Sequence, residues 1–248
     1  MRHCRRVIWA QNYRLGKLAE VFQHAKQKPS FTEIHESHIV EMVQSIDKSH
    51  FKRRLKRTPS IDSSLYTEDA LGVELFRAGV SNKNISDIIQ ALQQAERLCA
   101  WYESDDCGRK PSENEVVSHM ILPLFLGLGW SHQQIAVEWS NVDMAIFKTT
   151  PTTKEKCVII VEAKGLGQSL LSEVLDQAQR YVVGLGLRNV RYIVTTDGAN
   201  IFIYRKKQGQ WNSHPVGYIN VLSLQKEYIL PKGVDVVESL VRLQPGSV

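Results

Sequence analysis

Val158-Ile159-Ile160-Val161-Glu162-Ala163-Lys164 is a short apolar run that ends in Glu-Ala-Lys. Its β-branched residues predict a buried strand. Because successive side chains of a strand point to opposite faces, Glu162 and Lys164 should share one face. A buried sheet rarely tolerates an acid and a lysine on one face unless they are paired or bind a metal ion. The end of this strand is therefore the first candidate site.

A third ionisable residue, Asp143, lies upstream inside a second apolar run, residues 142–147. If the two runs form neighbouring strands, Asp143 and Glu162 supply two carboxylates, and the carbonyl of Ala163 could complete a set of oxygen ligands for a divalent cation. Lys164 could then orient a nucleophilic water and offset the negative charge that develops on a phosphate. This trio predicts metal-assisted hydrolysis of a phosphodiester.

Two predicted helices bring further polar residues towards this trio. Ser112 and Glu115 form a Ser-x-x-Glu capping box that opens a helix running through Leu128. Glu115 lies in its first turn and could bind the same metal ion or a second one. A later helix, residues 169–183, carries Gln177 and Tyr181 four positions apart, so that they present one polar edge.

The order of elements predicts an α/β fold with a mixed sheet flanked by helices. Strands are expected at residues 135–139, 142–147, 157–163, 192–196 and 201–204. The last two are joined by Asp197-Gly198-Ala199-Asn200, whose Asp-Gly pair is a strong hairpin signal. A further strand and a last helix near residues 234–243 are expected after about Trp211.

Several short motifs occur in a fixed order along residues 111–206. They are Glu115, Ile121-Leu122-Pro123-Leu124, Leu128-Gly129-Trp130, Val142-Asp143, Val161-Glu162-Ala163-Lys164-Gly165, Gln177-x-x-x-Tyr181 and Thr196-Asp197-Gly198. This order resembles the PD-(D/E)xK nuclease superfamily. In particular it resembles the nuclease-like domain at the N-terminus of type I restriction enzyme R subunits and its stand-alone relatives.

The resemblance implies a restriction-endonuclease-like domain with a four-stranded mixed core sheet, and a Mg²⁺-dependent endonuclease. Mn²⁺ is left open as an alternative ion. Asp143, Glu162 and Lys164 match its catalytic core, Glu115 its helix acid, and Gln177 the polar residue of the following helix. Two departures stand out: Val142 replaces the proline of the superfamily's name, and no Gly-x-x-x-x-Gly-Lys-Ser/Thr motif for an ATP-driven motor is present.

The expected reaction is hydrolysis of phosphodiester bonds, with DNA as the substrate that the resemblance favours. Two alternatives stay open. One is a catalytically inactive protein of the same fold that binds nucleic acid or has a regulatory role, and the other is a nuclease that acts on RNA. A homodimer is also left open, since a monomer would nick one strand and a two-fold dimer would cut both. A separate motor or specificity subunit is left open as a partner as well.

The basic charge is concentrated at the start of the chain. Residues 1–60 carry 13 Lys and Arg against 5 Asp and Glu. Within them, Lys52, Arg53, Arg54, Lys56 and Arg57 form a run that predicts either contacts with phosphates or a solvated linker. Together with Tyr181 this run is the candidate nucleic-acid surface. We therefore divide the chain into a basic region at 1–60, a helical hairpin at 61–110 and a nuclease-like domain at 111–248.

Other features of the sequence exclude alternatives. No apolar run is long enough for a transmembrane helix, so no membrane is expected as a partner. Four scattered cysteines without a Cys-x-x-Cys pair indicate neither a zinc site nor a disulfide framework, and they favour the cytoplasm. Residues 78–86 resemble the turn of a helix-turn-helix, but the apolar helix that follows favours a plain helical hairpin.

Overall fold

The computed structural model describes residues 65–170, 172–228, 231 and 233–248. Residues Ser64–Val248 form one compact unit. The boundary predicted near residue 110 falls inside this unit, because the helical hairpin and the sheet share one hydrophobic core. The basic run at Lys52–Arg57, like the rest of region 1–60, lies outside the described residues.

Two helices, α5 (Glu68–Arg77) and α6 (Asn82–Glu103), form the predicted hairpin. The side chains of Thr67 and Ser81 cap them by accepting the N–H three residues further on. The buried stripe of α6 packs against a third helix, α8 (Leu122–Gly127). A Cβ added at Gly127 would lie 2.9 Å from the Asp87 backbone, so glycine permits the close approach of these two helices.

The predicted helix from Ser112 is present but is interrupted by a π-helical turn. It consists of α7 (Glu113–Val116), the π-helical segment Val117–Ile121 and α8. Pro123 lacks an N–H and cannot donate to the carbonyl four residues earlier, which explains the wider turn just before it. Among the described residues, no helix is both long and apolar enough to cross a membrane.

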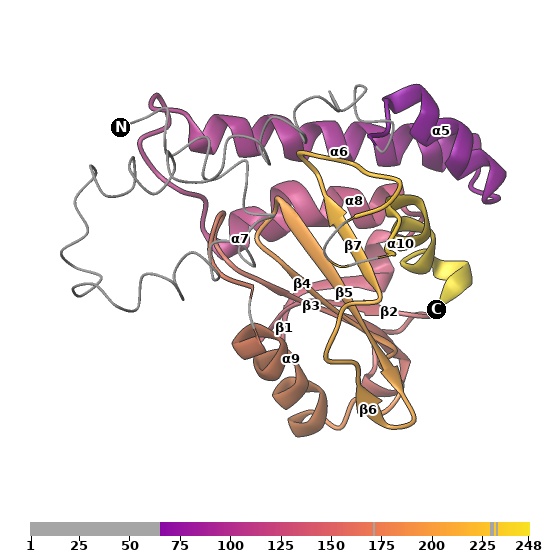
Figure 1. Cartoon of the computed structure of the whole chain (residues 1–248). Coiled ribbons are helices and arrows are strands. Elements are labelled where there is room, and N and C mark those ends of the chain that lie inside the picture. The colour runs from indigo at the N-terminus through magenta and orange to yellow at the C-terminus, as the bar shows by residue number, and fades with distance from the viewer. Residues whose placement is uncertain (1–64, 171, 229–230, 232) are drawn as a thin grey trace, which may run out of the picture. The chain divides into compact units, whose positions relative to one another are not determined.

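The strands form one open, mixed sheet (Figure 1). They are β1 (Ile135–Trp139), β2 (Val142–Phe147), β3 (Cys157–Ala163), β4 (Tyr192–Thr196), β5 (Asn200–Lys207), β6 (Gln210–Trp211) and β7 (Gly217–Asn220). The order is β1-β2-β3-β4-β5, and both β6 and β7 pair with β5. Only the β3–β4 pair is parallel among the described strands. The predicted bounds of the first four strands are confirmed, and the sheet has more strands than the four-stranded core that was expected.

Helices cover both faces of the sheet (Figure 1). Helix α9 (Ser172–Gly184) covers one face, and its Leu175, Ala178 and Val182 share a core with the strands. Helices α6, α8 and α10 (Val236–Arg242) belong to the larger core on the other face. Side chains of β2 and β3 alternate between the two cores: Ala145, Phe147 and Ile160 pack with α9, whereas Met144, Ile146, Ile159 and Val161 pack on the other side. The predicted α/β fold with a mixed, helix-flanked sheet is therefore confirmed.

Candidate active site

Asp143 and Glu162 lie side by side at one end of the sheet. In the β2–β3 ladder Met144 pairs with Val161, so the next residues outward, Asp143 and Glu162, are opposite each other. By the alternation of the strands, both belong to the face covered by α9. A carboxylate oxygen of Asp143 accepts a hydrogen bond from the backbone N–H of Ala163 at 2.7 Å. The structure thus brings the two predicted carboxylates together.

The Lys164 ammonium connects this pair to the start of α7. Its Nζ lies 3.2 Å from Glu162 Oε1 and 3.2 Å from Glu113 Oε1. Its side chain is 18% exposed, so the amine is partly shielded from water but still accessible. Burial opposes its charge, but the two carboxylates together outweigh that effect and raise the pKa of Lys164. Lys164 therefore stays a cation and can contact a bound phosphate.

Glu162 is the most constrained member of the site. Its side chain is 2% exposed, and Oε2 has no hydrogen-bond partner in the described part of the chain. Burial, assisted by the charge of Asp143, raises the pKa of Glu162 to about 7, although Lys164 opposes the shift. A buried carboxylate oxygen without a partner is costly. This oxygen is positioned to receive a cation or a proton.

Asp143 is also partly buried and lies among like charges. Burial raises the pKa of Asp143, and the N–H of Ala163 and the charge of Lys164 act in the opposite direction. Glu113 and Glu138 raise it further. Glu138 itself has a left-handed backbone, with φ of 52°, and accepts a hydrogen bond from the Asn114 side chain at 2.7 Å. The end of the sheet therefore concentrates negative charge around Lys164.

Glu113, rather than the predicted Glu115, is the acid of α7 that reaches the trio. The Glu115 carboxylate instead accepts hydrogen bonds from Arg109, at 2.6 and 2.7 Å, and from Ser112 in the capping box. The Arg109 guanidinium and the Ser112 N–H hold the pKa of Glu115 well below its usual range. Of the two acids, Glu113 is therefore the one that contacts Lys164, and the metal-binding role predicted for Glu115 has no contact with the trio to support it.

The loop after Lys164 is fixed by hydrogen bonds to the end of β4. The Lys164 N–H donates to the Thr196 carbonyl at 2.7 Å, and the Gly167 N–H donates to Asp197 at 3.3 Å. Asp197 also accepts from the backbone N–H groups of Ala199 and Asn200. Gly167 has a φ of +76°, which favours glycine. Asp197 thus holds the turn that positions Lys164, a role that its place in the hairpin motif did not indicate.

Gln177 lies in α9 beside Lys164. The two residues line one shallow depression of about 460 Å³ together with Ser169, Glu173, Val174, Asp176 and Arg180. The Gln177 amide donates to the Tyr181 hydroxyl at 3.2 Å, which confirms that these two side chains share an edge of the helix. Tyr181 is not among the lining residues. Gln177 is therefore near the trio, with Tyr181 one turn further along.

The oxygen atoms at the end of β3 suit a hard divalent cation. Asp143 and Glu162 offer carboxylates from adjacent strands, the Ala163 carbonyl directly follows Glu162 in the chain, and Glu162 Oε2 has no partner in the described part of the chain. No cluster of three or more His, Cys, Asp or Glu side chains with metal-binding geometry occurs in the described ranges. Mg²⁺ commonly takes only one or two protein carboxylates and keeps several waters. The residues present fit such an ion.

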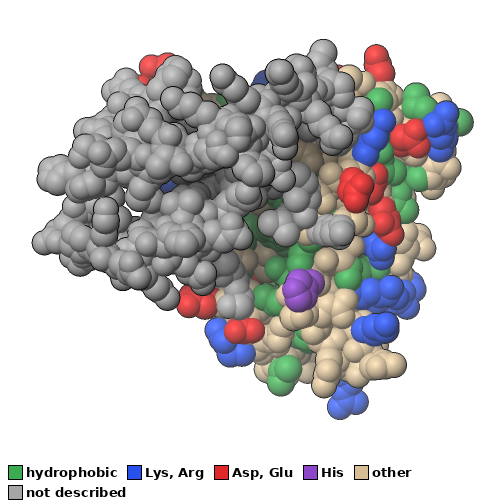
Figure 2. Space-filling model, in the orientation of Figure 1, with side chains coloured by type: hydrophobic (Ala, Val, Ile, Leu, Met, Phe, Trp, Pro, Cys, Tyr) green, Lys and Arg blue, Asp and Glu red, His purple; other side chains and the backbone are tan. Residues whose placement is uncertain are grey.

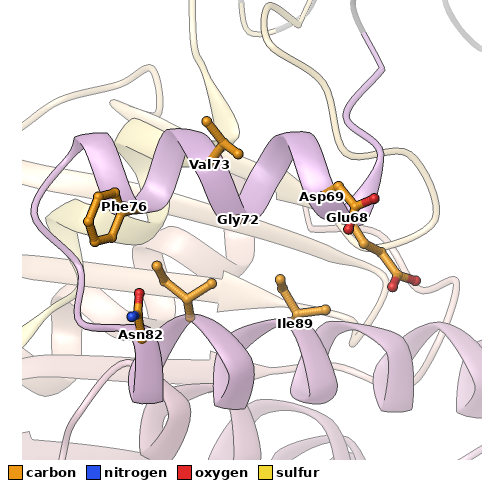
Figure 3. Close-up of a pocket in the computed structure, with 8 residues that line it drawn as sticks. Glu68, Asp69, Gly72, Val73, Phe76, Asn82 and Ile89 are labelled. Atoms are coloured by element: carbon orange, nitrogen blue, oxygen red, sulfur yellow. The ribbon is translucent and has the colours of Figure 1, made fainter.

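A second hollow of about 460 Å³ lies away from this chemistry, between α5 and α6 (Figure 3). Ile85 and Ile89 of α6 face Gly72 of α5. Glu68 and Asp69 lie at one end of the hollow (Figure 3). Two exposed apolar side chains, Val73 and Phe76, also line it, with 49% and 62% of their surface exposed. No lysine, arginine, histidine, cysteine or serine is among its lining residues, so the groove offers two carboxylates but no cation or nucleophile.

No protein-family model, no curated protein and no solved structure matches this chain.

Proposed function

We propose that this chain is a divalent-cation-dependent nuclease that hydrolyses phosphodiester bonds, with DNA as its substrate. One observation carries the proposal: Glu162 is buried opposite Asp143, one of its oxygens lacks a partner in the described part of the chain, and the other is 3.2 Å from the Lys164 ammonium. Two carboxylates and a lysine at one point serve cation binding and phosphate binding together. The resemblance to the PD-(D/E)xK superfamily supports the choice of DNA.

Each residue has a separate task in this reaction. Asp143 and Glu162 would hold Mg²⁺ with the Ala163 carbonyl, and the bound ion would supply Lewis-acid stabilisation of the phosphoryl oxygens. Lys164 contacts the phosphate and offsets the charge that develops in the transition state. Glu113 accepts a hydrogen bond from the Lys164 ammonium and so fixes its direction. Gln177 lies at the same depression and provides a polar contact for the substrate.

The raised pKa of Glu162 gives this function a pH dependence. Cation binding requires the ionised carboxylate, and the pKa of Glu162 is raised to about 7. Below that pH the Glu162 carboxyl group is largely protonated and binds Mg²⁺ weakly. Activity at limiting Mg²⁺ should therefore rise with pH through about 7, and saturating Mg²⁺ should move the midpoint to lower pH.

Cleavage by the purified full chain tests the function. Supercoiled plasmid, single-stranded DNA and RNA are incubated with wild type, Glu162→Gln and Glu96→Gln in Mg²⁺, Mn²⁺ or EDTA. Glu96 is an exposed acid of α6 and serves as the matched control. We expect metal-dependent cleavage of DNA by wild type and Glu96→Gln, and a loss of at least about a thousandfold in Glu162→Gln.

Other results would assign the protein differently. Cleavage of RNA alone would keep the chemistry and change the substrate. No cleavage by any protein, with DNA binding that persists in EDTA, would favour a nuclease-fold protein with a binding or regulatory role. Cleavage that survives Glu162→Gln would remove this site from the reaction.

A further inference from the structure

Lys and Arg residues gather at the opposite end of the sheet from the carboxylates. Three segments, residues 148–156, 188–191 and 205–207, contain eight Lys and Arg and a single acid, Glu155. The compact unit from residue 64 to residue 248 has 18 Lys and Arg and 20 Asp and Glu in all. Nearly half of its cations, but only one of its acids, therefore lie in these segments, which we call the basic end.

Backbone hydrogen bonds place the three segments side by side. The Lys148 N–H donates to the Lys156 carbonyl at 2.8 Å, and the Lys206 N–H donates to the Arg191 carbonyl at 3.1 Å. The Asn189 side chain donates to the Glu155 carbonyl at 2.6 Å, which joins the second segment to the first. Segments that are far apart in the sequence thus form one continuous surface across the ends of β2, β3, β4 and β5.

These cations are available to an external anion. The six ion pairs among the described residues include none of them. All but Lys156 and Lys206 are classed as exposed. Lys156 donates to the Thr150 carbonyl, and Lys206 lies 6.0 Å from the centre of the Trp211 ring, so neither is neutralised. In Figure 2, Lys and Arg side chains recur along the lower right of the visible face, where Figure 1 places the β5–β6 end of the sheet.

We infer that the basic end binds the phosphate backbone of duplex DNA, at a surface separate from the carboxylate site. The choice of DNA as the polyanion rests on the function proposed above. An exposed group of unpaired Lys and Arg releases counterions from DNA and reads charge rather than sequence. Eight residues separate Lys156 from Lys164 along β3, which corresponds to roughly 25 Å, or about seven base pairs of duplex. The basic end would therefore hold DNA away from the bond that is cut.

A nucleic acid fits this surface better than an anionic membrane does. Peripheral membrane surfaces usually combine basic residues with exposed apolar side chains that enter the lipid. The large apolar side chains that are exposed in the described part of the chain all lie outside the three segments: Leu65, Val73, Phe76, Trp101, Val137, Val183 and Leu222. The basic end thus offers charge without an apolar anchor.

The test removes one exposed cation from each segment in the full-length chain. Lys154→Gln, Arg188→Gln and Lys207→Gln are combined on the Glu162→Gln background, and binding of a fluorescent duplex of about 30 base pairs is followed by anisotropy in EDTA. A matched variant combines Lys83→Gln, Arg97→Gln and Lys226→Gln, which removes the same charge elsewhere on the surface. Thermal melting confirms that both variants fold.

We expect the first variant to bind DNA at least about tenfold more weakly and to lower the slope of log K against log salt by about 2 to 3. The matched variant should bind within about threefold of its parent. Equal losses in both variants, unchanged binding in the first, or no binding by the parent at low salt would each overturn the inference. So would selective loss of binding to phosphatidylserine vesicles with DNA binding unchanged.

The DNA-binding experiment can support the basic end even if the proposed nuclease reaction is wrong. A protein that binds DNA through the basic end in EDTA, but never cleaves it in Mg²⁺, retains the binding surface and loses the nuclease function. A third variant, with Lys52, Arg53, Arg54, Lys56 and Arg57 all changed to Gln, measures the contribution of the N-terminal run independently. A dominant effect of that variant, with none from the basic end, would also overturn the inference.

Discussion

The two ends of the sheet hold their charges in opposite ways. Where β3 ends, Glu162 is almost completely buried and shares the Lys164 ammonium with Glu113. Where β3 begins, exposed cations lie outside the ion pairs of the described residues. Burial weakens solvent screening, so each charge at the first end depends on individual neighbouring atoms. At the second end solvent and salt screen each charge strongly, so the attraction of an anion depends on how many cations lie there.

After the loss expected for Glu162→Gln, the largest expected effect comes from Lys164 at the buried end. Lys164→Met should lower the single-turnover rate of cleavage by at least about a hundredfold, because it removes a cation from the transition state. Binding of Mn²⁺ should persist, since both carboxylates remain. Lys110→Met is the matched control, because Lys110 is exposed and lies beside the loop at Gly167 without bridging the carboxylates. Equal losses in the two variants would contradict the role given to Lys164.

A change in salt concentration should affect the two ends of the sheet differently. Raising NaCl from about 50 to 200 mM should increase the KM for a long duplex by more than about tenfold, because binding at the basic end depends on counterion release. The single-turnover rate at saturating DNA should change by less than about twofold, because the buried charges are poorly screened. Measuring both quantities on one preparation gives the comparison. A rate that falls in parallel with affinity would show that the site is as exposed as the basic end.

Substitutions of Glu113 and Glu115, two positions apart in α7, should have different effects. Glu113→Gln should lower cleavage by about tenfold, since Glu113 orients the Lys164 ammonium. Glu115→Gln should leave the cleavage rate nearly unchanged and lower the Tm instead, because Glu115 pairs with Arg109 and closes the capping box. Cleavage assays and thermal melts of both variants distinguish the roles. The reverse pattern would restore Glu115 as the helix acid.

The smallest expected effect is on stability and follows from the pKa of Glu162. That pKa is raised from 4.5 to about 7, so the folded state retains a proton that the unfolded chain releases. The stability contributed by this proton is present below about pH 4.5 and is lost as the pH rises through about 7. Glu162→Gln should therefore become more stable relative to wild type between about pH 5 and 8, by ~3 kcal/mol at most.

Urea denaturation in EDTA at the two pH values measures this change, and Glu96→Gln controls for a change in net charge. A stability difference between wild type and Glu162→Gln that is independent of pH would show that Glu162 titrates normally.

The sequence predicted the strands and the Asp143–Glu162 pair because both follow from local patterns. Apolar and β-branched runs define β2 and β3, and the alternation of side chains assigns a face to each residue. The alternation of side chains along this run was enough to predict that Glu162 and Lys164, at its end, share one face. The pairing of Asp143 with Glu162 required only that two consecutive strands pair with each other, as β2 and β3 do across the connection at residues 148–156.

The choice between Glu113 and Glu115 could not be made from spacing alone. Two positions on a helix differ by about 200° in direction, and the rotation of α7 depends on its packing against β3. One available signal did point to Glu113. A capping box turns the side chain of its Glu back towards the N-cap residue, so the prediction of that box with Ser112 already directed Glu115 away from the sheet.

The basic end was not predicted because its residues come from three distant segments. Lys154 and Arg188 each lie near only one or two other basic residues, and Arg205-Lys206-Lys207 is a run of only three. The register of β3, β4 and β5 brings their segments to one end of the sheet. The basic run at Lys52–Arg57 is conspicuous in the sequence because its charges are consecutive. Patterns that depend on tertiary pairing are therefore the ones that linear spacing misses.

Whether Glu162 binds the cation is measured by a calorimetric titration of the full chain with Mn²⁺ near pH 7, in two buffers with different enthalpies of ionisation. If Glu162 Oε2 receives the cation, wild type and Glu96→Gln should bind Mn²⁺ and release part of a proton, because the pKa of Glu162 is about 7. Glu162→Gln should lose both the binding and the proton release. Binding that survives unchanged in Glu162→Gln, or no binding by wild type, would contradict the account.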